Sequence, residues 1–85
     1  MSSAAISRFE LIKDILIYIA VSDHAVTALE LEERVVDMAR GQVNYLLRGL
    51  LADDYLALSQ KGRSGAGMYI ATLKTKQLFG IQNDK

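Results

Sequence analysis

The sequence predicts an α+β domain in which three helices precede a two-stranded β-hairpin. Apolar residues recur at helical spacing as far as residue 53, and the period changes to two after Asp54. The glycine-rich loop KGRSGAG, residues 61–67, then separates two alternating runs, as in a hairpin. Eighty-five residues correspond to one domain. We expect this single domain over 1–85, with a core spanning about 7–73.

The composition limits how such a domain is stabilised and where it functions. The chain has no cysteine and no cluster at metal-ligand spacing, so we expect neither disulfides nor a metal. Its longest apolar run, 15–21, is far shorter than the ~20 residues that span a bilayer. No signal peptide is evident. The sequence therefore predicts a cytoplasmic protein without membrane association, metal or cofactor.

The charges are balanced overall but unevenly distributed along the chain. Formal net charge is zero, which is unusual for a protein that binds nucleic acid. Residues 1–37 carry three basic and seven acidic side chains, whereas residues 38–85 carry seven basic and three acidic ones. This asymmetry is a weak indication of an anionic partner for the second half.

The first helix is expected from about Ser7 to Ala20, with Ser7 as N-cap and Glu10 as its capping-box partner. Two apolar stripes give this helix an apolar arc of nearly half its circumference. Either the helix is buried on two sides within the domain, or the second stripe contacts another copy in a homodimer. The first stripe is Phe9, Ile12, Leu16 and Ile19, and the second, the candidate dimer interface, is Leu11, Ile15 and Tyr18.

A second, shorter helix is expected after the connector SDHAV, residues 22–26. Thr27 and Glu30 form a complete capping-box pattern, and the helix is expected to end near Val36. The inner face is predicted to be Leu29 or Leu31, together with Val35.

The third helix is expected over about 39–53, after a tight turn that Met38 pins to the core. Val43, Leu47 and Leu50 fall on one line and form its buried face. The opposite side carries hydrogen-bonding side chains and a glycine, namely Arg40, Gly41, Gln42, Asn44, Tyr45 and Arg48. We expect this helix to dock through one face and to offer the other to a partner.

Two strands and a C-terminal segment complete the predicted elements. Residues 55–60 and 68–73 alternate between side chains of two faces, on either side of the glycine-rich loop. The tail KTKQLFGI, residues 74–81, is either a short helix or an edge segment. Its apolar residues Leu78, Phe79 and Ile81 are available for packing.

The order of helix, helix, turn, helix and hairpin resembles the winged helix-turn-helix DNA-binding family over about Ser7 to Leu73. The stretch TALELEERVVDMARGQVNYLLRGLLADDYLAL is similar to the family's positioning helix, turn, recognition helix and first wing strand. Two positions depart from the family pattern. Asp54 stands where glycine commonly takes a left-handed conformation, which aspartate tolerates better than most residues. Ala39 stands where serine or threonine usually caps the recognition helix, and Asp37 is an alternative cap.

The resemblance implies that helix 39–53 enters the major groove of double-stranded DNA and that the 61–67 wing contacts the backbone or minor groove. Arginine can pair with guanine, and asparagine or glutamine with adenine, whereas loop cations suit phosphates. The expected function is a small sequence-specific transcriptional regulator acting as a homodimer. The candidate DNA-binding residues are Arg40, Gly41, Gln42, Asn44, Tyr45, Arg48, Lys61, Arg63 and Ser64. Each has a simpler interpretation as a solvated side chain or, for Tyr45, as packing against the wing or a partner.

Other functions have less support in the sequence. His24 is the only histidine and is more typical of a solvated or capping residue. Asp53 and Asp54 are adjacent and fit a turn better than an acid–base pair. We expect no enzyme activity and no small-molecule ligand. The alternative is a winged-helix module that binds protein instead of DNA, favoured by the zero net charge and the wide apolar arc of the first helix.

Overall fold

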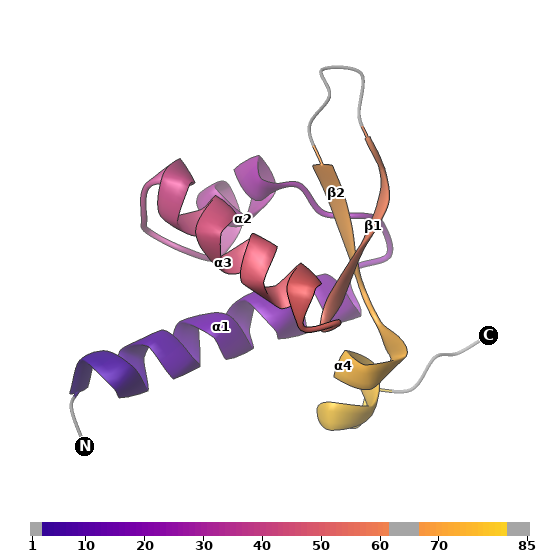
Figure 1. The fold of residues 1–85 in the computed structure, drawn as a ribbon, viewed down its shortest axis with the longest axis horizontal. Helices are drawn as coiled ribbons and strands as arrows, with labels where there is room; N and C mark the ends of the chain where they lie inside the picture. Colours follow the sequence, from indigo (N-terminus) through magenta and orange to yellow (C-terminus); the bar gives the residue numbers. More distant parts are fainter. Residues whose placement is uncertain (1–2, 62–66, 82–85) are drawn as a thin grey trace.

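A computed structural model describes residues 3–61 and 67–81 of the chain, with side chains for 6–59 and 67–81. Three helices precede a two-stranded antiparallel hairpin and a short C-terminal helix, which confirms the predicted α+β class and is compatible with the winged-helix layout. The hairpin stands beside the helices, and the last helix lies near its base (Figure 1). The elements are α1 (Ser3–Val21), α2 (Ala28–Arg34), α3 (Arg40–Ala52), β1 (Leu56–Lys61), β2 (Gly67–Ala71) and α4 (Leu73–Leu78).

Helix α1 begins earlier and is rotated differently from the prediction. It starts at Ser3, so Ser7 lies within the helix and is not its N-cap. Phe9, predicted as core, is 67% exposed. Leu16 and Ile19 of the predicted core stripe are buried as expected, and Ile15, which was assigned to the second stripe, is buried with them. Nearly continuous apolar residues leave the rotation of such a helix undetermined by its sequence. Neither α1 nor any other described helix is long and apolar enough to cross a membrane.

This rotation corrects the predicted dimer interface. Ile15 is fully buried in the protein's own core, so it cannot contact a second copy. Leu11 and Tyr18 are half-buried and pack against the same core. The second stripe of α1 therefore faces the domain's own core. This agrees with the interpretation that the helix is buried on two sides within the domain.

The core lies where α1, α2, α3 and the base of the hairpin meet. The choice between Leu29 and Leu31 is resolved, because Leu31 is fully buried and Leu29 is 49% exposed. The predicted buried face of α3 is confirmed. The buried apolar cluster comprises Ile15, Leu16, Ile19, Val26, Leu31, Val36, Val43, Leu47, Leu50 and Leu56.

The two helix N-caps behave differently. Thr27 caps α2 as predicted, because its Oγ1 accepts a hydrogen bond from the backbone N–H of Glu30 at 3.2 Å. Ala39 is the N-cap residue of α3 and no side chain caps this helix, so the predicted cap from Asp37 is wrong. The first turn of α3 therefore lacks the side-chain acceptor that usually satisfies one of its amides.

Residues 53–55 form the α3–β1 junction, where the chain turns sharply out of the helix. Asp54 has φ +67°, which confirms the left-handed conformation predicted for it. Side chains from the start of α4 bond the exposed carbonyls of the junction. Lys74 Nζ donates to the carbonyl of Asp53 at 2.8 Å. Thr72 Oγ1 donates to that of Asp54 at 2.7 Å, and Thr75 Oγ1 to that of Tyr55 at 2.6 Å.

The hairpin is joined to the helices by one further backbone pair. Within it, the register changes between Leu58 and Lys61, so β1 carries an extra residue relative to β2. Val26, in the connector between α1 and α2, pairs with Tyr69 of β2. The N–H of each donates to the carbonyl of the other, at 2.9 and 2.8 Å. The predicted connector thus adds a one-residue strand to the hairpin.

Candidate nucleic-acid interface

A hollow of about 440 Å³ lies where the start of α2, the first half of α3 and the base of β2 meet. We call it the wing-side hollow. Polar side chains of α3 border it on one side and the hairpin borders it on the other. Its lining residues are Thr27, Ala28, Leu29, Arg40, Asn44, Gly67 and Tyr69.

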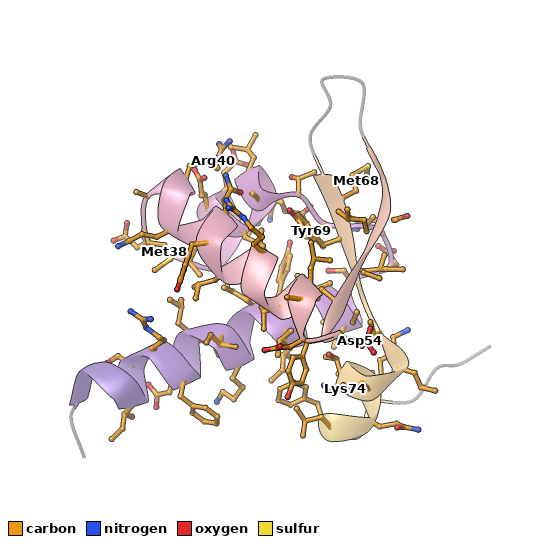
Figure 2. All side chains as sticks on the ribbon, viewed as in Figure 1. Met38, Arg40, Asp54, Met68, Tyr69 and Lys74 are labelled. Atoms are coloured by element: carbon orange, nitrogen blue, oxygen red, sulfur yellow. The ribbon has the colours of Figure 1, made fainter. Side chains whose placement is uncertain are left out.

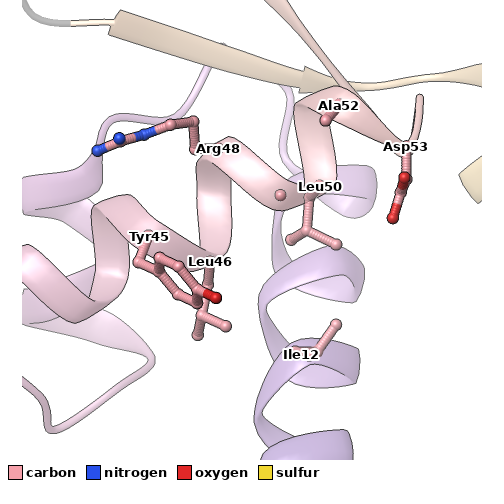
Figure 3. A pocket seen from close by; sticks show the side chains of 8 residues that line it. Ile12, Tyr45, Leu46, Arg48, Leu50, Ala52 and Asp53 are labelled. Carbon is pink, nitrogen blue, oxygen red and sulfur yellow. The ribbon is translucent and has the colours of Figure 1, made fainter.

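The outward side of α3 divides into two faces. Arg40, Asn44 and Arg48 follow one another at four-residue spacing and form a polar row. Tyr45 is 69% exposed and borders the apolar side chains of Ile12 and Leu46. Figure 3 shows Arg48 and Tyr45 leaving α3 in different directions, with Arg48 pointing away from Ile12 of α1. Arg40 and Asn44 therefore lie on a different surface from Tyr45, whereas Arg48 shares a hollow with Tyr45.

Arg40 is oriented by an ion pair with Glu32 of α2. Its Nε contacts Glu32 Oε2, and half of the Arg40 side chain remains exposed. An exposed ion pair contributes only about 0–1 kcal/mol. The pair therefore holds the Arg40 guanidinium between the start of α3 and α2. Exchanging Glu32 for a phosphate or a base would cost little. The guanidinium has five N–H donors, so others remain for a phosphate or a guanine edge.

Tyr69 reaches the wing-side hollow from the hairpin. Its backbone is fixed by the two hydrogen bonds to Val26. A Cβ built on Gly67 would lie 3.2 Å from Tyr69 Oη and 3.3 Å from Leu58 Cδ2, so the absence of a side chain at Gly67 allows this close approach. Figure 2 shows Tyr69 between α3 and β2. A tyrosine hydroxyl at this place can donate to a phosphate oxygen.

The structure brings together only some of the predicted residues. Arg40 and Asn44 share the wing-side hollow, and Arg48 continues their row. Gly41 and Gln42 are exposed near the start of α3 and border a different hollow, with Tyr45, beside α1. Three predicted wing contacts fall beyond this description: Lys61 is described only in its backbone, and Arg63 and Ser64 lie outside the described residues.

Three residues of the hollow were missed by the sequence reasoning. Tyr69 belongs to a strand run whose outward and inward faces the alternation alone does not distinguish. Leu29 was one of two alternatives for the inner face of α2, and its exposure places it at the hollow. Thr27 was recognised as a cap only. A tyrosine two residues after a glycine-rich loop, in a strand of a hairpin, was the available signal for Tyr69.

A second polar cluster links α1, the connector and α2. The Glu30 carboxylate accepts a hydrogen bond from the Tyr18 hydroxyl at 2.5 Å and lies 2.9 Å from His24 Nε2. His24 Nδ1 lies 3.0 Å from the Asp23 carboxylate. Glu30 thus bonds Tyr18 and His24, and the reciprocal half of the predicted capping box is not formed. The His24 side chain is 54% exposed, as expected for a solvated residue, and its contacts also join the connector to α2.

These contacts shift the pKa values of the cluster. The neighbouring carboxylates of Asp23 and then Glu30 raise the pKa of His24 above its usual value of 6.5. The hydrogen bond from His24 lowers the pKa of Asp23, and those from Tyr18 and then His24 lower the pKa of Glu30. The bond to Glu30 raises the pKa of the Tyr18 hydroxyl. Because every member already has a partner, the cluster is better suited to holding α2 than to chemistry on a substrate.

Comparisons with models of protein families, with curated proteins and with solved structures found no match. Within 3–61 and 67–81 there is also no group of three or more histidine, aspartate or glutamate side chains arranged to hold a metal ion.

Proposed function

We propose that this chain is a sequence-specific double-stranded DNA-binding protein, acting as a homodimeric transcriptional regulator. One observation carries the proposal: Arg40 and Asn44 of α3, the start of α2 and the base of the hairpin border a single concave surface. Helix-turn-helix proteins with a wing bind DNA through these same three elements. The role would place the protein where DNA is held, in agreement with the cytoplasmic location expected from the sequence.

The chemistry of the surface suits base recognition at the first half of α3. Arg40 and Asn44 offer the guanidinium and amide groups that pair with guanine and adenine in the major groove. Gln42 is also exposed in this half of α3, but it borders the hollow beside α1. The groove is about 12 Å wide, enough for one helix. Leu29, an exposed apolar side chain at the same hollow, suits contact with a thymine methyl group.

The number of cations predicts weak binding by a single copy. Arg40 and Arg48 from α3, with Lys61 and Arg63 from the hairpin, give four candidate phosphate contacts. Each contact contributes about −0.9 to the slope of log affinity against log salt, so one copy should show a slope of roughly −3 to −4. A homodimer doubles these contacts and binds two half-sites. The zero net charge therefore favours a dimeric binder over a monomeric one.

The alternative function is a protein-interaction module. It is favoured by Tyr45, which is 69% exposed and lies between two hollows formed with α1. An exposed aromatic bordered by apolar side chains is typical of protein interfaces. Under this alternative, the Tyr45 face contacts the partner and the polar row is merely solvated.

Fluorescence polarisation with a random-sequence duplex separates the two functions. The wild-type chain should bind at micromolar concentration in low salt, and binding should fall steeply as salt is added. The double variant Arg40→Ala/Arg48→Ala should lose at least about tenfold in affinity and lower the salt slope by about 2. Lys76→Ala in α4 removes a cation away from the polar row and serves as the matched control. Absence of binding at low salt, or equal loss in the control, would refute the proposal.

Selection of bound duplexes from a random library tests sequence specificity. Asn44→Ala should relax the preference at one adenine-containing position, with a loss of about 1–3 kcal/mol in discrimination there. Arg48→Ala should weaken binding to selected and random duplexes alike if it contacts phosphate. A wild-type protein that selects no common sequence would limit the function to nonspecific binding.

A further inference from the structure

An apolar hollow of about 430 Å³ lies between α1 and α4, on a part of the molecule separate from the wing-side hollow. We call its surface the α1–α4 face. Phe9 of α1 and Leu78 of α4 are 67% and 62% exposed at this face. Ile6, one helical turn before Phe9, is 44% exposed. The hollow is lined by Phe9, Ile12, Lys13, Leu16, Leu50, Asp53, Tyr55, Leu78 and Phe79.

We infer that two copies of this chain associate through the α1–α4 face. The inference rests on the proposed function and deepens it, because it names the surface through which the homodimer forms. It replaces the predicted interface of Leu11, Ile15 and Tyr18, whose central residue is buried in the core.

The shape of the face is suited to pairing with itself. In a two-fold dimer the same patch on both copies makes the contact, so a projecting group and its receiving hollow must belong to one patch. Phe9 is a largely exposed ring at the border of a hollow that its own α1 and α4 help to line. A two-fold arrangement lets the Phe9 of each copy enter the hollow of the other. Buried aromatic anchors of this kind dominate the energetics of interfaces.

The charges of the face are also complementary to themselves. Lys13 of α1 and Asp53 at the end of α3 both line the hollow, one cation and one anion. Neither has an ion-pair partner among the residues that the structure describes. When two such faces meet across a two-fold axis, Lys13 of one protomer can face Asp53 of its partner, and the contact occurs twice. This self-complementarity is the reason for choosing a second copy as the occupant.

Association through this face leaves the DNA-binding surface accessible. The α1–α4 hollow and the wing-side hollow have no lining residue in common. In Figure 1, α1 and α4 lie below α3, whereas the hairpin extends above it. Both copies can therefore present Arg40 and Asn44 while they are paired, whereas Arg48 borders a hollow that it shares with Ile12, Leu50 and Asp53 of the α1–α4 face.

Sedimentation of the full chain without DNA, over a wide concentration series, tests the inference. The wild type should show a concentration-dependent dimer. Phe9→Asp and Leu78→Asp should each weaken dimerisation at least about tenfold, because each places a charge in the apolar contact. Leu73→Asp is the matched control, since Leu73 is 64% exposed on α4 but does not line the hollow. Circular dichroism should show that all three variants remain folded, because the side chains are exposed.

A charge exchange identifies the second copy as the occupant. Lys13→Asp and Asp53→Lys should each weaken the dimer, because each places like charges opposite one another. The double variant should recover dimerisation, since the attraction is restored with its sign reversed. A monomer at every concentration, or a dimer unaffected by Phe9→Asp and Leu78→Asp, would overturn the inference, as would a double variant no better than the single ones.

The outcome is separable from that of the DNA-binding experiment. A chain that dimerises in this way but ignores duplex DNA refutes the proposed function and supports the dimer surface. A chain that binds duplex DNA while remaining monomeric without it supports DNA binding and refutes the dimer surface.

Discussion

Helix α3 is held differently at its two ends. At the C-terminal end, the side chains of Thr72, Lys74 and Thr75 donate hydrogen bonds to the carbonyls of the α3–β1 junction. At the N-terminal end no side chain caps the helix, and Arg40 makes one exposed ion pair. Figure 2 shows the two ends, with Asp54 and Lys74 near α4 and Arg40 at the far end.

The difference suggests that the C-terminal end of α3 positions the helix, whereas its N-terminal half contacts the partner. A binding helix needs a fixed direction, which packing and hydrogen bonds at its base can supply. Its contacting side chains are more useful when they are not already committed to strong internal bonds. In α3 the buried face and the C-terminal end supply the first property, and the exposed first half supplies the second. Gly41 fits this division, because a Cβ built there meets no atom within 4 Å.

The largest effect is expected at the C-terminal end, from Thr75→Val. Thr75 is fully buried, and its hydroxyl donates to the Tyr55 carbonyl. Valine keeps the shape but removes the donor, so unfolding in urea should show a loss of about 1–2 kcal/mol. An unchanged stability in this variant would mean that the other side-chain donor to the same carbonyl, Thr72, already suffices.

Asp54 offers a second test of the same end. Its φ of +67° is costly for a side chain without aspartate's local hydrogen bonding. Asp54→Ala should lower stability by about 1 kcal/mol relative to Asp54→Gly, because glycine adopts this conformation freely. Thermal unfolding of the two variants compares them directly. Equal stabilities would indicate that the junction relaxes to another conformation in the variants.

A smaller effect, of opposite sign, is expected at the N-terminal end. Ala39 has φ −66° and ψ 150°, which suit an N-cap residue. Ala39→Ser should therefore supply the missing acceptor and stabilise the protein by about 0.5–1 kcal/mol in urea unfolding. Ala39→Val, which offers no acceptor, is the control. A stabilised chain with unchanged duplex affinity would show that this end tolerates a cap without losing its contacts.

The smallest effect concerns the cluster of Asp23, His24 and Glu30, which holds α2 beside the N-terminal end of α3. The folded pKa of His24 is raised, so its contribution to stability is complete below about pH 6.5 and is lost as pH rises through the raised value. The lowered pKa values of Asp23 and Glu30 mean that their contribution is present above about pH 4.5 and is lost in more acidic solution. His24→Gln should abolish the alkaline decline in melting temperature. A decline of equal size in the variant would assign it to another group.

The sequence predicted α3 best because several signals agree there. Its buried residues recur at one period, and the change to strand alternation marks its end, so Arg40–Ala52 matches the expected range closely. The left-handed conformation of Asp54 was expected from the resemblance to the winged-helix pattern, in which glycine commonly stands at this position, and aspartate tolerates that conformation. The centre of the buried face of α1 was not predictable from its own residues, since two adjacent apolar stripes occupy nearly half of its circumference. Its earlier start is explained by alanines that carry the helix past the capping signal at Ser7.

The candidate site was predictable only in part, because half of it depends on tertiary contacts. The polar row of α3 follows from helical periodicity alone. The contribution of Tyr69 depends on a one-residue strand at Val26, and a single residue leaves no period in the sequence. In the same way, Glu30 matched a capping-box pattern, but Tyr18 and His24 bond its carboxylate instead. Local patterns identify possible partners, and the folded neighbours decide among them.

The pairing of Val26 with Tyr69 closes a ring through the molecule. The covalent path from one to the other runs through α2, α3 and β1, and two hydrogen bonds complete the circuit. A closed circuit of this kind resists shearing, because α3 cannot slide along its axis without pulling the hairpin and the connector with it. Among the described residues, the connector, α2, α3 and the base of the hairpin should therefore meet a partner as one unit.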